Sequence, residues 1–101
     1  MTIVVQIGNT DDKLTQGGWA HFCSDLMGTV SRHDVTTHFS GGSSCTMPWQ
    51  NYCMVFEQGP DLTLHSLLRD LQYLAHRHKQ DSIAVTIGDT IFLNGAEEPD
   101  A

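Results

Sequence analysis

Basic residues are scarce in this chain. Lys and Arg number 5 against 12 Asp and Glu, and the formal net charge is −7. A protein that binds nucleic acid needs an excess of positive charge to displace counterions from the phosphates. The composition therefore argues against ordinary DNA or RNA binding, and leaves only a local basic patch or an acidic mimic of nucleic acid as exceptions.

Long apolar runs are also missing. A membrane-spanning helix needs about 20 consecutive apolar residues, and the apolar stretches of this sequence are far shorter. Residues 1–8 contain neither Lys nor Arg, so they lack the basic segment that opens a signal peptide. We therefore expect a protein without a membrane partner that stays in the cytoplasm.

Cysteine is present in an odd number, as Cys23, Cys45 and Cys53, which argues against a disulfide framework. In a cytoplasmic protein we expect these residues to be reduced thiols. Cys45 and Cys53 lie near His33 and His38 in the sequence, but no Cys-x-x-Cys or His-x-x-x-His pair is present. Because zinc sites usually carry such pairs, the sequence predicts no metal site. It predicts no cofactor either.

Strand and helix periodicities are clear along most of the chain. Alternating or continuous apolar patterns predict strands at Thr2–Ile7, Val35–Ser40, Tyr52–Glu57, Ser82–Ile87 and Ile91–Leu93. Apolar residues spaced three and four apart predict amphipathic helices over Trp19–Val30 and Leu64–His78. This order predicts an α+β fold, a ferredoxin-like β-α-β-β-α-β sandwich with an extra C-terminal hairpin strand. Two helices would cover one face of an antiparallel sheet.

A single α+β domain is predicted over residues 1–95. Gly88-Asp89 has the composition of a two-residue turn that would join the last two strands. Residues 96–101 include Glu97, Glu98 and Asp100, and none of them looks able to join a core. We expect this segment to be a disordered acidic tail.

One face of the sheet is left uncovered by the two predicted helices. Strand alternation places on it Val4, Gln6, His38, Cys53, Val55, Ala84 and Thr86. The same alternation places Phe39 on the opposite face. The uncovered surface is too apolar to be wholly solvated. We expect it to bind a partner or a second copy, which predicts a homo-oligomer, unless the last hairpin folds over it.

The Gly/Ser-rich loop before the third predicted strand carries the first candidate site. Its segment Pro48-Trp49-Gln50-Asn51 offers an indole plane for stacking and two amides that can read a base or a peptide edge. Alternatively, Trp49 closes one end of the core, because most Trp side chains are largely buried.

Two residues outside this loop complete the predicted ligand-binding set, which is Trp49, Gln50, Asn51, His38 and Arg69. Arg69 belongs with Arg77 and Lys79 to the second predicted helix and its C-terminal end, which hold three of the five basic residues. This cluster of basic residues could bind an anionic partner. Alternatively, cations near a helix C-terminus only complement the helix dipole.

An enzymatic alternative rests on His38. The run His38-Phe39-Ser40 resembles one half of the paired His-x-Ser/Thr signature of 2H phosphoesterases, but no correct second half is present. The alternative is a small hydrolase or phosphoesterase-like enzyme that uses His38 with Cys45 or Cys53. With the signature incomplete, we assign no catalytic residue.

Two segments of the sequence resemble small bacteriophage accessory proteins, a family whose chemistry is unassigned. They are residues 5–16, Val-Gln-Ile-Gly-Asn-Thr-Asp-Asp-Lys-Leu-Thr-Gln, and residues 48–51, Pro-Trp-Gln-Asn. The resemblance implies a non-structural protein that acts in the cytoplasm of an infected bacterium. Such a protein would bind and inhibit a host protein, or sequester a nucleotide-like signal, in counter-defence or host takeover. The family assigns no functional residue that could be carried over.

Overall fold

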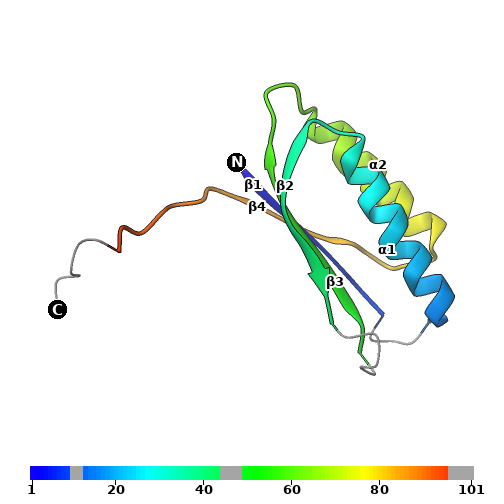
Figure 1. Ribbon diagram of the computed structural model, residues 1–101. Helices are drawn as coiled ribbons and strands as arrows, with labels where there is room; N and C mark the ends of the chain where they lie inside the picture. Colours follow the sequence, from blue (N-terminus) through cyan, green and yellow to red (C-terminus); the bar gives the residue numbers. More distant parts are fainter. Residues whose placement is uncertain (10–12, 44–48, 96–101) are drawn as a thin grey trace.

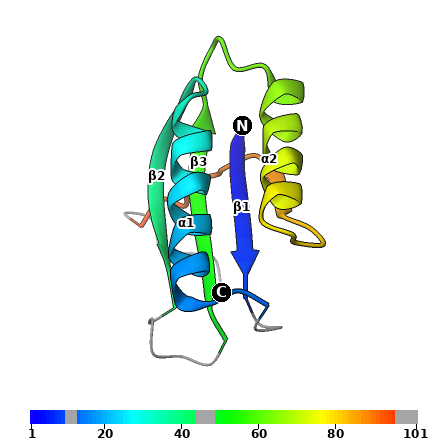
Figure 2. The same cartoon turned by 90° about the vertical axis from the view of Figure 1, so that its right-hand side faces the viewer.

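A computed structural model describes residues 1–9, 13–43 and 49–95 of the chain. Its elements are β1 (Thr2–Gly8), α1 (Gln16–Ser31), β2 (Val35–Gly42), β3 (Asn51–Gln58), α2 (Leu64–Arg77) and β4 (Ala84–Gly88). The strands form an antiparallel sheet in the order β2-β3-β1-β4. Both helices cover the same face of this sheet (Figures 1 and 2). The predicted α+β, ferredoxin-like arrangement of two helices on an antiparallel sheet is confirmed.

The core lies between the sheet and the two helices. Helix α1 begins after Thr15, whose Oγ1 accepts a hydrogen bond from the backbone N–H of Gly18 at 3.1 Å and so caps the helix. The buried apolar side chains come from β1, α1, β3 and α2. They are Ile3, Val5, Ile7, Phe22, Leu26, Val30, Met54, Phe56, Leu67, Leu71 and Leu74.

The face of the sheet opposite the helices is called the open face below. The strand register places Val4 beside Val55 and Thr86 on it, and Gln6 beside Cys53 and Ala84, as the alternation predicts. Val4, Cys53 and Val55 are half-buried there by their neighbours in the sheet. Among the described residues, no helix packs over this face, since both helices lie on the other side of the sheet (Figure 1).

Phe39 lies on the open face, and its predicted place on the helix-covered face is wrong. The register of β2 against β3 shifts between Thr37, which pairs with Phe56, and Phe39, which pairs with Val55. His38 is the extra residue of this β-bulge. A bulge residue interrupts the strict alternation of sides, so Phe39 turns outward and is 56% exposed.

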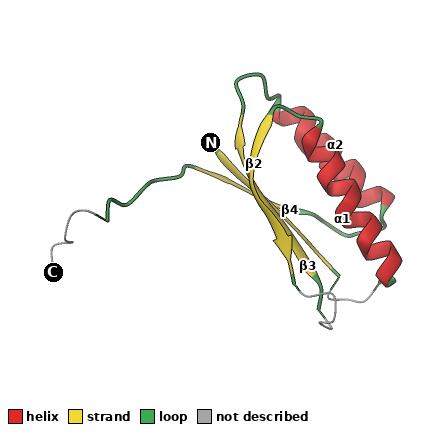
Figure 3. Ribbon diagram, in the orientation of Figure 1, coloured by secondary structure: helices red, strands yellow, loops and turns green. Residues whose placement is uncertain are grey.

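The predicted fifth strand at Ile91–Leu93 is also absent from the structure. Residues beyond Gly88 leave the body past the N-terminus as a loop on the side away from the helices (Figures 1 and 3). Two-residue hairpin turns require a positive φ at one or both central residues. Within the described part of the chain, no glycine has a positive φ, and Asp89 does not have one either. The chain therefore does not turn back at Gly88-Asp89.

The predicted tail, residues 96–101, lies outside the described residues. No helix in the described ranges is both long enough and apolar enough to cross a membrane.

Candidate functional site

A buried amide network joins three elements at one end of the sheet. The side chain of Asn9, just after β1, donates to Gln50 Oε1 at 3.0 Å, and Gln50 Nε2 donates to Gln16 Oε1 at 2.8 Å. The backbone N–H of Asn9 also donates to the carbonyl of Gln50 at 2.8 Å. Asn9 further exchanges hydrogen bonds of 3.0 Å with both backbone groups of Leu14. These contacts fix the end of β1, the start of α1 and the approach to β3 against one another.

The network separates the roles of two predicted site residues. Gln50 is only 3% exposed, and its side-chain amide is occupied by Asn9 and Gln16, so it is not an exposed recognition group. Trp49, the preceding residue, is 56% exposed. The alternative that Trp49 closes one end of the core is therefore wrong. The indole projects from a backbone that Gln50 anchors.

Asn51 is exposed at the first position of β3. Its backbone is held by Ser43, whose Oγ accepts from the N–H of Asn51 at 2.9 Å and whose own N–H donates to the carbonyl of Asn51 at 3.0 Å. The remaining loop residues 44–48, with Cys45 and Pro48, lie outside the described residues. Trp49 and Asn51 are thus the exposed residues on either side of the buried Gln50.

His38 and Arg69 lie away from Trp49. His38 is exposed at the bulge of β2. The pKa of the Glu57 carboxyl is lowered first by the hydrogen bond from Thr2, then by the N-terminal amine, and least by His38. Arg69 is exposed on α2, on the other side of the sheet. The five predicted residues do not converge on one site, and ligand binding at His38 and Arg69 stays a prediction.

A hollow of about 360 Å³ opens at the same end of the sheet as the amide network. It is lined by Gln6, Ile7, Gly8, Gln80, Asp81, Ser82 and Ala84. Asp81 on its wall lies 3.4 Å from Lys13 Nζ, and Gly8 pairs with Asn51 across the strands. The volume falls at the lower end of the range of small-molecule sites, and the lining offers amide, hydroxyl and carboxylate groups.

The enzymatic alternative gains no pair of reacting groups from the described residues. Cys53 pairs with Gly41, whereas His38 is the bulge residue between Thr37 and Phe39, which pair with Phe56 and Val55. At a rise of about 3.3 Å per residue, His38 lies about 7–10 Å from Cys53 along the strands. A nucleophile and its base need to lie within hydrogen-bonding reach. Cys45, the other predicted partner, lies outside the described residues.

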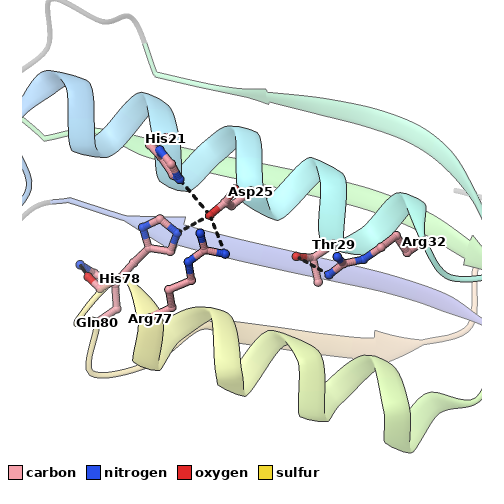
Figure 4. A network of polar contacts seen from close by, with 7 residues as sticks. All are labelled: His21, Asp25, Thr29, Arg32, Arg77, His78 and Gln80. Carbon is pink, nitrogen blue, oxygen red and sulfur yellow. Dashed lines mark hydrogen bonds and ion pairs between the residues drawn. The ribbon is translucent and has the colours of Figure 1, made fainter.

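A second polar cluster links the two helices (Figure 4). Asp25 Oδ2 on α1 lies 2.8 Å from His78 Nε2, 3.2 Å from His21 Nε2 and 3.8 Å from Arg77 Nη1. The hydrogen bond with His78, together with the positive charges of His21 and Arg77, lowers the pKa of Asp25 below its ordinary value. The ring of His78 also stacks on Phe22, with centroids 4.7 Å apart. The cluster therefore fastens the end of α2 to α1.

His21, Asp25 and His78 each offer one potential metal-ligand atom, and these atoms lie within 4.8 Å of one another. Arg77 places a permanent positive charge beside the same carboxylate. That charge would oppose a cation, so we assign the cluster to the packing of the helices. The spacing of His21 and Asp25, one helical turn apart, could have indicated this cluster from the sequence. No pattern in the sequence around His78 indicated that it contacts Asp25.

Comparison with protein-family models finds no match for this chain, and neither does comparison with curated proteins. Among solved structures, the chain is similar to formyltetrahydrofolate deformylase from Burkholderia mallei ATCC 23344, with a TM-score of 0.54 and 15% sequence identity. The similarity covers 84% of this chain but only 27% of the deformylase chain. At this level of identity the likeness concerns the fold, and it agrees with the ferredoxin-like arrangement of strands and helices.

Proposed function

We propose that the protein is a non-catalytic bacteriophage accessory protein that binds and inhibits a host protein in the bacterial cytoplasm. The observation that carries the proposal is the pair of exposed aromatic side chains, Trp49 and Phe39, each 56% exposed. Large aromatic residues supply much of the energy of protein interfaces. Within the described residues, His38 and Cys53 belong to different positions of the strand register, with Gly41 and not His38 opposite Cys53, so the proposal rests on binding.

Phe39 belongs to strand β2 and Trp49 directly precedes the anchored Gln50, which limits the entropy that binding would cost. Trp49 precedes Gln50, which the amide network anchors. The ring of Phe39 lies over Gly41 of the same strand, where an added Cβ would come within 2.9 Å of Phe39 Cζ. On the open face, Phe39 continues a row through Val55 to Val4. This row gives the partner an apolar strip across three strands.

The charge of the chain suggests the character of the host partner. With a formal net charge of −7, the protein would be drawn to a basic surface, since opposite charge speeds encounter and disfavours acidic partners. The partner proposed here therefore combines an apolar patch with a basic surround.

Capture from host lysate tests the proposal. The wild-type protein is expected to enrich one host protein, and Trp49→Ala and Phe39→Ala are each expected to lose it. Tyr73→Ala is the matched control, because Tyr73 is an exposed aromatic residue on α2, away from the open face. If all three variants capture the same protein as the wild type, the aromatic surface is not the binding site.

The hollow lined by Gln6 and Ser82 favours a second candidate function, the sequestering of a nucleotide-like signal. Its amide and hydroxyl groups can hydrogen-bond a base, and Trp49 at the same end of the sheet can stack on one. A thermal-shift series with nucleosides and nucleotides tests this candidate, because a ligand that binds the native state raises the melting temperature. A shift that persists in Gln6→Ala and Ser82→Ala would place the ligand elsewhere.

We also propose that the protein works as a homo-oligomer. The support is the amount of apolar side chain left exposed, on the open face and beyond β4. Light scattering across a tenfold dilution tests it, and a mass that stays monomeric would contradict it.

A further inference from the structure

Strand β4 is an edge of the sheet with one side unpaired. Within the described ranges it pairs only with β1, over Ala84–Gly88. Its other side presents backbone N–H and C=O groups that can pair with another chain. Natural proteins usually protect such an edge with charge, proline or a bulge. The residues of β4 are Ala84, Val85, Thr86, Ile87 and Gly88, which include none of these protections.

The segment that follows β4 exposes an apolar tripeptide. Ile91, Phe92 and Leu93 are 79%, 92% and 89% exposed. Residues beyond Gly88 continue away from the body past the N-terminus (Figure 1). Residues 89–95 are called the arm below. An apolar arm of this kind is costly to leave in water, so its position requires something to cover it.

A hollow lies between α2 and β4, on the helix-covered side of the edge strand, and its lining is partly apolar and partly polar, the polar residues being Gln72, His76, Gln80, Asp81 and Ser82. Its volume is about 410 Å³. Its apolar wall is formed by Leu68, Leu71, Ala75, Ile83 and Val85. Leu68 at its mouth remains exposed. The hollow opens at the residues that precede β4, the opposite end of the strand from the arm.

We propose that two copies of this chain pair β4 to β4 in antiparallel fashion, and that the arm of each fills the α2–β4 hollow of the other. The inference deepens the proposed homo-oligomer and rests on it. In a symmetric antiparallel pair, the C-terminal end of one strand runs beside the N-terminal end of the other. With Thr86 on the twofold axis, position 91 of one copy lies opposite position 81 of the second copy. Asp81 is on the wall of the hollow.

Side-chain alternation directs the arm into the hollow. Val85 and Ile87 face the helices, because they pair with the buried Val5 and Ile3 of β1. Extending the same alternation in the pair of strands places Ile91 and Leu93 on the helix side. These two side chains would then meet the apolar wall of the hollow.

Light scattering of the full chain gives the first test. The wild type is expected to be a dimer, and the double variant Ile91→Asp, Leu93→Asp is expected to be a monomer with its melting transition retained. Phe39→Asp is the matched control, since it adds a charge on the open face and should leave the dimer intact. If the wild type is monomeric, the oligomer proposal and this interface both fail. If the Phe39 variant alone dissociates a wild-type dimer, the oligomer stands and the interface lies on the open face.

Disulfide trapping gives a second test that does not depend on weakening the dimer. The native cysteines are first replaced by Ser, and one cysteine is then introduced at Val85, Thr86 or Ile87. If the strands pair, a cysteine at position 86 lies opposite the same cysteine of the second copy, and one at position 85 or 87 lies close to it. Directly opposed residues have Cα atoms about 4.5–5.5 Å apart, which a disulfide can bridge. We expect oxidation to cross-link at least one of these variants and not Phe39→Cys. Cross-linking at position 39 alone would overturn the edge pairing.

Discussion

At the scale of single residues, adjacent side chains of the same loop take opposite roles. Gln50 is buried in the amide network, whereas Trp49 before it and Asn51 after it are exposed. The sequence Trp-Gln-Asn predicts a group of aromatic and amide side chains without saying which of them is buried. That choice depends on Asn9 and Gln16, which come from distant parts of the sequence.

Replacing Gln50 by Ala should lower the free energy of unfolding by about 1–3 kcal/mol, because it removes the buried hydrogen bonds of Gln50 to Asn9 and Gln16, while Asn9 keeps those to Leu14. Asn51→Ala should change it by less than about 0.5 kcal/mol, since the side chain is exposed. Urea unfolding of the two variants measures both values. Equal midpoints would show that the network contributes no stability.

Asp25→Asn should lower the free energy of unfolding by about 1 kcal/mol at neutral pH, because the variant loses the charge-assisted bond to His78. The pKa of Asp25 is lowered in the folded state from its ordinary 3.8. Its contribution is therefore complete above pH 3.8 and is lost as the pH falls through the folded-state pKa.

The stability difference between wild type and Asp25→Asn should accordingly fade below pH 3.8. Urea midpoints measured from neutral to acid pH give the curve, with Asp81→Asn as the control, since the Asp81 side chain is 91% exposed. A difference that stays constant into acid would show that Asp25 acts through packing and not through its charge.

At the scale of elements, hydrophobic periodicity correctly predicted the two helices and the core strands. It missed the features that depend on how strands pair with one another. The apolar faces of α1 and α2 and the alternation of β1 could be predicted, because their buried residues recur at helical spacing in α1 and α2 and at every second position in β1. The bulge at His38 was not readable, because it exists only in the pairing of β2 with β3. The prediction of a fifth strand was wrong because the backbone at Gly88-Asp89 does not make the hairpin turn that its composition favours.

Deleting His38 should be tolerated, with a melting temperature within a few degrees of the wild type. The residue is the extra one in the bulge, so Thr37 and Phe39 would keep their present partners and sides. Deleting Val55 should instead abolish cooperative unfolding, because a one-residue slip in β3 turns Phe56 out of the core. Thermal melts of both deletions decide the matter, and loss of the fold on deleting His38 would contradict the bulge.

The packing of α1 can be tested through its cysteine. Partial burial raises the pKa of Cys23 to about 11, so its thiol should react slowly with iodoacetamide at pH 8, where little thiolate is present. Mass spectrometry over a time course should show Cys23 modified quickly only after urea unfolding. Fast modification in the native protein would show that this side of α1 opens readily.

At the scale of the whole molecule, a small acidic domain presents different surfaces for different tasks. The helices and the inner sheet face hold the core. The open face and Trp49 are the proposed surface for a host partner, and the β4 edge is the proposed surface for a second copy. Composition argues against ordinary nucleic-acid binding, and strand alternation predicted an uncovered sheet face, while the partner stays a proposal. The site residues could be only partly predicted, since Arg69 lies on α2 whereas Trp49 lies in the loop before β3.

The proposed binding surface depends above all on Trp49, and the decisive measurement is the affinity of Trp49→Ala for the captured host protein. We expect the Kd to rise about 30-fold or more, as for a hot-spot aromatic residue. The urea midpoint should stay near that of the wild type, because an exposed indole contributes little to the core. A Kd equal to the wild-type value in a stable Trp49→Ala protein would show that Trp49 is not part of the binding surface.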